Sequence, residues 1–211
     1  MLSAVNPIVD VDACARAGCT PLDLLRACLD AGATFIQLRA KRLDSGPFLE
    51  LADAAVMRAA PYGGQIIVND RVDVARLAGA AGVHVGQEDL PPAAARRLLG
   101  ADATVGCSTH TVEQADAALR EPVSYVAVGP VFGTRTKDTG YEAVGLDLVR
   151  AVHRLAGSIP VVAIGGITLD NAGAVLDAGA TSVAVIGDLL ATGDPGARVA
   201  AYVQVLGRHR V

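Results

Sequence analysis

The sequence predicts one α/β domain over residues 1–211, a closed (β/α)8 TIM barrel, and three observations support this fold. Short apolar runs, typical of strands buried on both faces, alternate along the chain with segments of helical period. Similar small-residue turns, Ala31-Gly32-Ala33 and Ala178-Gly179-Ala180, lead from helix to strand. Polar residues follow most of the apolar runs, as they do at the mouth of such a barrel.

The elements can be assigned in order along the chain. Thr20, Ser45 and Thr168 are expected to begin helices, because hydroxyl side chains cap helix starts. The weakest strand signal covers residues 2–9, since Pro7 is unfavourable inside a sheet. Further strands are expected at 34–38, 65–68, 82–85, 103–107, 123–128, 160–164 and 181–186, and helices at 21–31, 45–60, 71–79, 91–99, 111–119, 145–156, 168–178 and 195–207. A doubly wound open sheet is the alternative, but no GxGxxG motif follows the first strand.

Composition restricts the classes of partner. Aromatic residues make up 3% of the chain, so a stacking platform for nucleic acid is not expected. The net charge of −4, without a long run of one sign, also argues against a nucleic-acid surface. No apolar stretch approaches the roughly 20 residues that span a bilayer, so no membrane partner is expected. The four cysteines form no CxxC pair and are expected to be reduced in a cytoplasmic protein, while a homo-oligomer remains open.

Basic residues at the end of the second strand indicate a small phosphorylated ligand. Gln37, Arg39 and Lys41 alternate with a period of two, so all three are expected to face the same side. A planar guanidinium and a compact ammonium together suit a diphosphate. For Arg39 the structural alternative is a salt bridge to a neighbouring strand.

Loops after the later strands are expected to bind a second phosphate. Gly165-Gly166 and Gly187 follow the last two strands, where barrels often bind phosphate through backbone N–H groups. The alternative is a tight turn that requires a positive φ. The loop 129–137 adds two hydroxyls and two cations within four residues, a density that suits phosphate oxygens.

Two aspartates after neighbouring strands indicate a metal site. Asp70 and Asp89 each follow an apolar run, and adjacent strands would bring both carboxylates within reach of one hard cation. Mg²⁺ usually takes one or two protein carboxylates together with phosphate oxygens and water. Helix capping is the common alternative for such aspartates. Glu88 is the competing ligand, although it is expected to point away from Asp89.

No pair of side chains typical of nucleophilic catalysis is apparent. Cys107 adjoins Ser108, but it is expected to be a small apolar filler of its strand. His84 is expected to be a hydrogen-bonded residue of the barrel, and His110 to orient neighbouring groups. Neither histidine has a partner at catalytic spacing, so no general base is assigned.

Taken together, these segments resemble the thiamine-phosphate synthase family, also called the thiamine-phosphate pyrophosphorylases. The resemblance covers about residues 34–190. Its segments are Gln37-Leu38-Arg39-Ala40-Lys41, Val68-Asn69-Asp70-Arg71-Val72-Asp73, Gly82-Val83-His84-Val85-Gly86-Gln87-Glu88-Asp89-Leu90, Ser108-Thr109-His110-Thr111, Val128-Gly129-Pro130-Val131-Phe132 with 134–137, Val162-Ala163-Ile164-Gly165-Gly166-Ile167 and Val183-Ala184-Val185-Ile186. No single segment is specific, but their combination is.

The resemblance implies an activity and a set of site residues. The enzyme would join a hydroxymethylpyrimidine diphosphate to a hydroxyethylthiazole phosphate, or its carboxylated form, releasing diphosphate and forming thiamine phosphate. Asp70 and Asp89 would hold Mg²⁺. Catalysis would involve Arg39, Lys41, Ser108 and Lys137. The pyrimidine diphosphate would contact Gln37, Leu38, Arg39, Ala40, Lys41, Asn69, Ser108 and Lys137, and the thiazole phosphate would contact Thr134, Arg135, Thr136, Gly166, Ile186 and Gly187.

The implied chemistry agrees with the residues present. A dissociating diphosphate leaves a pyrimidinylmethyl cation that the thiazole nitrogen attacks, so no protein nucleophile is needed. One departure from the family pattern is Gly187, where Ser is common. A thiazole tautomerase on the same barrel is the alternative enzyme, but its relatives lack the paired aspartates. A non-catalytic regulator that binds phosphate ligands is the alternative from another class.

Overall fold

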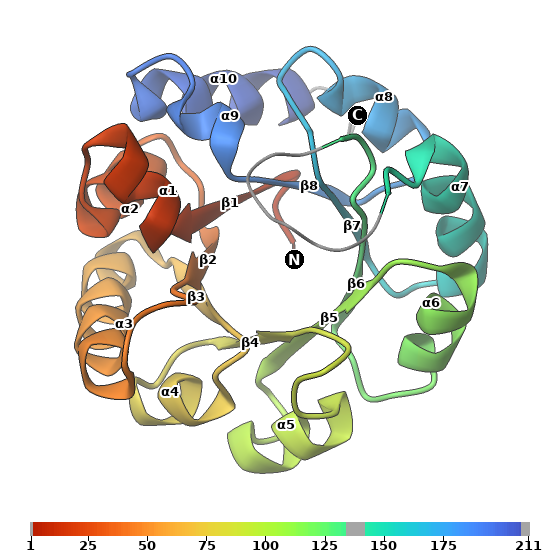
Figure 1. The fold of residues 1–211 in the computed structure, drawn as a ribbon, viewed down its shortest axis with the longest axis horizontal. Helices are drawn as coiled ribbons and strands as arrows, with labels where there is room; N and C mark the ends of the chain where they lie inside the picture. The colour runs from red at the N-terminus through yellow and green to blue at the C-terminus, as the bar shows by residue number, and fades with distance from the viewer. Residues whose placement is uncertain (1, 134–141, 208–211) are drawn as a thin grey trace.

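The computed structural model describes residues 2–133 and 142–207, whose strands form a closed parallel barrel (Figure 1). The strands pair in chain order, and β8 returns to pair with β1. Their bounds are β1 (Val5–Asp10), β2 (Phe35–Arg39), β3 (Gln65–Asn69), β4 (Gly82–Val85), β5 (Thr104–Thr109), β6 (Tyr125–Val128), β7 (Val161–Ile164) and β8 (Ser182–Val185). The predicted TIM barrel is therefore confirmed, and each predicted strand overlaps an observed one.

Helices surround the barrel on its outside (Figure 1). Those that follow predicted helical segments are α2 (Pro21–Asp30), α3 (Ser45–Ala59) with the 3-10 turn η1 (Ala60–Tyr62), α4 (Val72–Leu77), α5 (Pro92–Leu99), α6 (Val112–Leu119), α7 (Gly145–Ala156), α8 (Ala172–Asp177) and α10 (Pro195–Gly207). Two short helices were not predicted, α1 (Val11–Ala17) and α9 (Gly187–Leu190). Each follows its strand directly, and each is too short to display a clear helical period.

Two of the three predicted helix starts are confirmed, at Thr20 and Ser45, and the third, at Thr168, is wrong. Thr20 does cap α2, because its hydroxyl accepts from the Asp23 N–H at 3.1 Å. Ser45 is the first residue of α3, after Asp44. Thr168 lies before α8, which begins at Ala172, and its backbone N–H donates to Asn171 Oδ1 at 2.9 Å. The side chain of Asn171 thus orders the turn that the sequence assigned to the helix.

Pro7 does not weaken the first strand. All six residues of β1 are buried, and Pro7 is in register with Val185 of β8. A proline removes only one backbone donor from the ladder, and the flanking pairs of β1 with β2 and β8 remain. The strand therefore closes the barrel and places Asp10 at its carboxyl end.

The apolar core has two layers, one inside the barrel and one between the barrel and the helices. Ile8, Ile67 and Tyr125 belong to the inner layer, and Val9 and Val68 belong to the outer one. Alternate residues of a strand supply the two layers, which explains why the strands read as continuous apolar runs. Within residues 2–133 and 142–207, no helix combines the length and the apolar character that a membrane span requires.

Candidate active site

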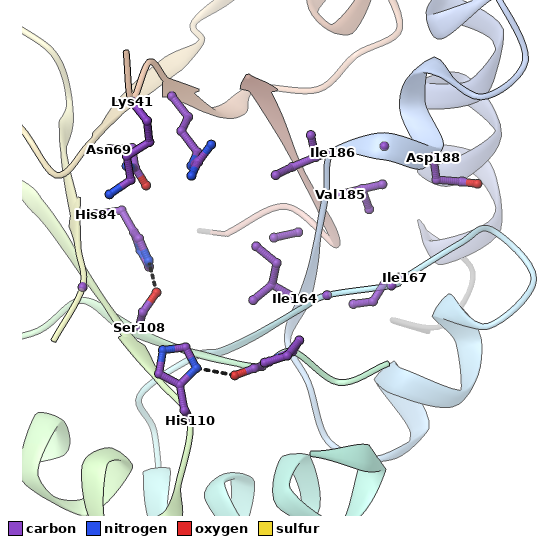
Figure 2. Close-up of a pocket in the computed structure, with 18 of the residues that line it drawn as sticks. Lys41, Asn69, His84, Ser108, His110, Ile164, Ile167, Val185, Ile186 and Asp188 are labelled. Carbon is purple, nitrogen blue, oxygen red and sulfur yellow. Dashed lines mark hydrogen bonds between the residues drawn. The ribbon is translucent and has the colours of Figure 1, made fainter. Parts of the chain in front are cut away.

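A cavity of about 730 Å³ opens at the carboxyl ends of the strands, where the predicted site residues converge. Its lining comes from residues at or just after the ends of β2 to β8, so segments that are far apart in sequence meet there. Figure 2 shows Lys41 and Asn69 on one side of this cavity and Ile186 and Asp188 on the other. Predicted site residues that line it are Arg39, Lys41, Asn69, Asp70, Asp89, Ser108, Gly166, Ile186 and Gly187.

Arg39 is held at the cavity by a buried ion pair with Asp10. The guanidinium Nη1 donates to Asp10 Oδ2, and the exposed fractions of the two side chains are 13% and 3%. The other oxygen, Oδ1, accepts from the Ala13 N–H at 2.8 Å and thereby caps α1. The alternative of a salt bridge to a neighbouring strand is thus correct for Arg39. Arg39 nevertheless lines the cavity, so the salt bridge is compatible with a role in binding a phosphorylated ligand.

Asp70 and Asp89 lie close together, as expected for residues that follow the neighbouring strands β3 and β4. Lys41 forms an ion pair with Asp70, and Asp89 accepts from the Gly86 N–H at 2.7 Å. Burial, together with the adjacent carboxylate of Asp89, raises the pKa of Asp70 in spite of the ion pair. Asp70 has a φ of +63°, which is unusual for a residue other than glycine and points to a functional constraint on the backbone.

This carboxylate pair fits a cation that takes its other ligands from outside the protein. The residues of 2–133 and 142–207 include no cluster of three or more His, Cys, Asp or Glu that could hold a metal alone. Mg²⁺ commonly uses one or two carboxylates and completes its shell with phosphate oxygens and water. Neither aspartate caps a helix, because α4 begins after Arg71 and α5 after Pro91. Glu88 also lines the cavity, contrary to the expectation that it points away, but it is exposed.

A chain of buried polar side chains leads from the barrel interior to Ser108. His84 Nε2 is 2.8 Å from Ser108 Oγ, a contact drawn in Figure 2, and His84 Nδ1 is 2.9 Å from the Tyr125 hydroxyl. The Tyr125 hydroxyl also contacts the Gln37 side chain. His84 is therefore a hydrogen-bonded barrel residue, as predicted. The network fixes the position of Ser108, whose hydroxyl faces the cavity.

Three of the predicted pyrimidine-site residues do not line the cavity. Gln37 is only 3% exposed and lies deeper in the barrel than Arg39, so it does not share the open mouth with Arg39 and Lys41. Leu38 and Ala40 point the other way, into or against the apolar layer beneath the helices. The alternation of a strand explains the outcome for Leu38 and Ala40, because neighbouring residues face opposite sides of the sheet, whereas Gln37 shares the face of Arg39 and differs only in depth.

The loops after β6 and β7 are packed backbone against backbone. Gly165 and Gly166 have φ values of +103° and +61°. A Cβ added at Gly165 would lie 2.5 Å from Pro130 Cα, and one added at Gly166 would lie 2.6 Å from the Gly133 carbonyl oxygen. The turn interpretation of these glycines is therefore correct. The turn also exposes backbone groups to the cavity, which keeps the phosphate interpretation open.

Gly187 is the first residue of α9 and has no positive φ. Ile186, which precedes it, is 8% exposed and contributes an apolar surface to the cavity. The part of the sequence motif formed by Thr134, Arg135, Thr136 and Lys137 lies outside the described residues.

His110 and Cys107 have structural contacts. His110 Nδ1 is 2.5 Å from the Gly129 carbonyl oxygen, so this side chain links the loops after β5 and β6 (Figure 2). Burial raises the pKa of the Cys107 thiol to about 11, which keeps it protonated at neutral pH. The interpretation of Cys107 as a strand filler is therefore supported, since only a thiolate would be nucleophilic.

Two charged residues of the site were missed from the sequence. Asp10 follows an apolar run in the same way as Asp70, but its strand gave the weakest signal because of Pro7, and no site residue was sought there. Asp188 follows Gly187 directly, and nothing in the local sequence indicates its partners on α10.

Comparison with known proteins agrees with this geometry. A family model described as thiamine monophosphate synthase matches residues 5–189. A thiamine-phosphate synthase of Koribacter versatilis is 50% identical over 149 residues, covering 71% of this chain and 69% of that protein. One from Albidiferax ferrireducens is 41% identical over 194 residues, covering 92% and 88%.

A solved structure gives the same result at the level of the fold. The thiamine phosphate pyrophosphorylase from Pyrococcus furiosus superposes with a TM-score of 0.86 at 30% identity, covering 97% of this chain and 95% of that one. The residues matched by the family model, 5–189, include all eight strands and the positions of Asp70 and Asp89. The chain belongs to the thiamine-phosphate synthase family.

Proposed function

We propose that the cavity binds a pyrimidine diphosphate beside β2 to β5 and a thiazole phosphate beside β7 and β8, and that it joins them with loss of diphosphate. The observation that carries this proposal is the separation of charge within one cavity. Arg39, Lys41, Asp70 and Asp89 lie on one side of it, and on the other lie glycine backbone, apolar side chains and Asp188, whose carboxylate is paired with Arg198. This arrangement suits two phosphorylated substrates that carry different charge.

On the charged side, the side chains are set to hold a leaving diphosphate. Arg39, fixed by Asp10, and Lys41 would contact its oxygens. Asp70 and Asp89 would hold Mg²⁺, which when bound would neutralise charge that develops on the leaving group. If Asp70 held the cation, its partner Lys41 would be available to the diphosphate. The family resemblance adds Lys137 to this side.

On the neutral side, the protein would bind the thiazole phosphate mainly through backbone N–H groups. Gly166 and Gly187 border the cavity, and Ile186 offers an apolar wall for the thiazole ring. The resemblance assigns Thr134, Arg135 and Thr136 to the same phosphate.

The reaction proposed for this arrangement requires positioning of the two substrates. The bond between the pyrimidinylmethyl carbon and the diphosphate oxygen breaks, and the diphosphate keeps the electron pair. The thiazole nitrogen then donates its lone pair to that carbon. Ser108, oriented by His84, and Asn69 would orient the pyrimidine diphosphate. The carboxylate pair and the names of the relatives favour this condensation over a tautomerase, which would move a proton and join nothing.

One assay tests the proposal against its alternatives. Purified protein is incubated with both substrates, with and without Mg²⁺, and diphosphate and thiamine phosphate are measured. We expect stoichiometric formation of both products only when both substrates and Mg²⁺ are present. Isomerisation of the thiazole substrate without the pyrimidine would indicate a tautomerase. Tight binding of the thiazole phosphate without any turnover would indicate a regulator.

A further inference from the structure

One carboxylate at the neutral side of the cavity joins three elements of the fold. Asp188, the second residue of α9, accepts from the Leu169 N–H at 3.3 Å and from the Tyr202 hydroxyl at 2.6 Å. Arg198 Nε and Nη2 donate to its two oxygens, each at 2.9 Å. Leu169 belongs to the loop after β7, and Arg198 and Tyr202 belong to α10. Figure 2 shows the Asp188 side chain directed away from Lys41 and Asn69.

We propose that Asp188, Arg198 and Tyr202 form a positioning cluster that holds the two glycine segments at the spacing required by the thiazole phosphate. This inference rests on the proposed function, in which Gly166 and Gly187 bind that phosphate. Asp188 is adjacent to Gly187, and its bond to the Leu169 N–H reaches the loop that contains Gly166. A second hydrogen bond holds this loop: Asn171 Nδ2 donates to the Gly166 carbonyl oxygen at 3.1 Å.

The charge of Asp188 explains why Arg198 is part of the cluster. A carboxylate one residue from a phosphate site would repel the phosphate unless its charge were neutralised. Although burial acts in the opposite direction, the hydrogen bonds from Arg198 and Tyr202 lower the pKa of Asp188, so it remains ionised at neutral pH. The exposed fractions of the Arg198 and Asp188 side chains are 21% and 10%, so water screens their interaction only weakly. The bidentate ion pair with Arg198 therefore offsets the repulsion between the Asp188 carboxylate and the phosphate.

A double-mutant cycle with three variants separates positioning from simple packing. In Arg198→Gln, the Asp188 carboxylate loses its cation, and we expect the KM for thiazole phosphate to rise about tenfold. In Asp188→Asn the hydrogen bonds to Asp188 weaken but no negative charge is left beside the phosphate, and a rise of about threefold is expected. The double variant, which has neither charge, should return close to the Asp188→Asn value. The KM for the pyrimidine diphosphate should stay within about twofold throughout.

A structural role alone would give a different pattern. It would lower the melting temperature and leave the two KM values unchanged, or change them together. The dephosphorylated thiazole alcohol supplies a further readout. Arg198→Gln should weaken binding of the thiazole phosphate but leave the inhibition constant of the alcohol unchanged. Arg150→Gln is the matched control, since Arg150 forms an exposed ion pair with Asp147 on α7. If Arg198→Gln does not fold, Tyr202→Phe tests the same cluster, with an expected rise of about twofold in the thiazole-phosphate KM alone.

A reference variant distinguishes failure of this inference from failure of the proposed function. Gly166→Ala places a Cβ against the Gly133 carbonyl at a φ of +61° and should raise the thiazole-phosphate KM. If Gly166→Ala does so while Arg198→Gln and Asp188→Asn do not, the positioning cluster is overturned and the phosphate site stands. If Gly166→Ala instead raises only the pyrimidine KM, the assignment of the phosphate site is wrong, and the inference fails with it.

Discussion

The β2 to β5 side of the cavity presents charged side chains, whereas the β7 and β8 side presents glycine turns and apolar walls. On the first side, both cations that the structure describes at the cavity have a carboxylate partner: Arg39 has Asp10, and Lys41 has Asp70. On the second side, the carboxylate of Asp188 is turned away from the cavity and neutralised from behind by Arg198. Within one cavity, the first side therefore presents paired cations and carboxylates to a ligand, and the second side keeps its carboxylate neutralised and directed away.

The difference follows from what happens to each substrate. A departing diphosphate gains charge as its bond breaks, so groups that favour this change lower the barrier. An esterified phosphate has the same charge before and after the reaction, so it needs binding without selective stabilisation of a transition state. Charged, metal-binding side chains suit the first task, and fixed backbone donors suit the second.

The largest effect is expected from the carboxylate pair. Asp89→Asn should lower kcat by about 10²–10³-fold, because it removes one of the two carboxylates proposed to hold Mg²⁺ at the leaving group. Steady-state kinetics at saturating substrate measure this change. Glu88→Gln is the matched control, because Glu88 is the adjacent carboxylate and is exposed, and it should keep nearly full activity. Full turnover of Asp89→Asn, or of chelator-treated enzyme, would contradict the metal assignment.

The next largest effect is expected at the buried ion pair of the charged side. Asp10→Asn should lower the free energy of unfolding by about 1.5–3 kcal/mol, because Arg39 loses a charged hydrogen-bond partner, while the amide can still cap α1. The KM for the pyrimidine diphosphate should rise as Arg39 becomes less ordered. Denaturant unfolding and kinetics measure the two effects. Asp12→Asn is the control: its partner Arg42 is 85% exposed, so little change is expected. Equal effects of both substitutions would indicate that Asp10 has no special role.

The smallest effect is expected at Gly187. Gly187→Ser should lower the thiazole-phosphate KM by about threefold, because a hydroxyl adds a hydrogen bond to a charged group. Backbone strain does not oppose this gain, since Gly187 begins a helix and has no positive φ. Gly187→Ala separates the effect of the added carbon from that of the hydroxyl. A change confined to the pyrimidine-diphosphate KM would show that the segment at Gly187 binds the pyrimidine diphosphate and not the thiazole phosphate.

Much of this comparison could be predicted from the sequence, and the exceptions have identifiable causes. The strands were predictable because both faces are buried, and the strand-end residues converge because a closed parallel barrel leaves them no other place. Asp10 was missed because the first strand, weakened in the prediction by Pro7, was expected to end at residue 9, and no role was sought at its end. Asp188 was missed because its partners lie 10 and 14 residues away on another helix, where no spacing rule links them. Gln37 was placed too near the mouth, since its depth in the barrel depends on strand tilt and not on alternation alone.

The most direct test of the two-sided cavity is the Mg²⁺ dependence of binding to each side separately. Calorimetric titration of the intact protein with diphosphate, and in a separate experiment with the thiazole phosphate, is carried out with Mg²⁺ and with chelator. We expect removal of Mg²⁺ to weaken diphosphate binding by at least about tenfold, which corresponds to about 1.4 kcal/mol, and to change the Kd of the thiazole phosphate less than twofold. An equal dependence of both ligands on Mg²⁺, or none for diphosphate, would contradict the account.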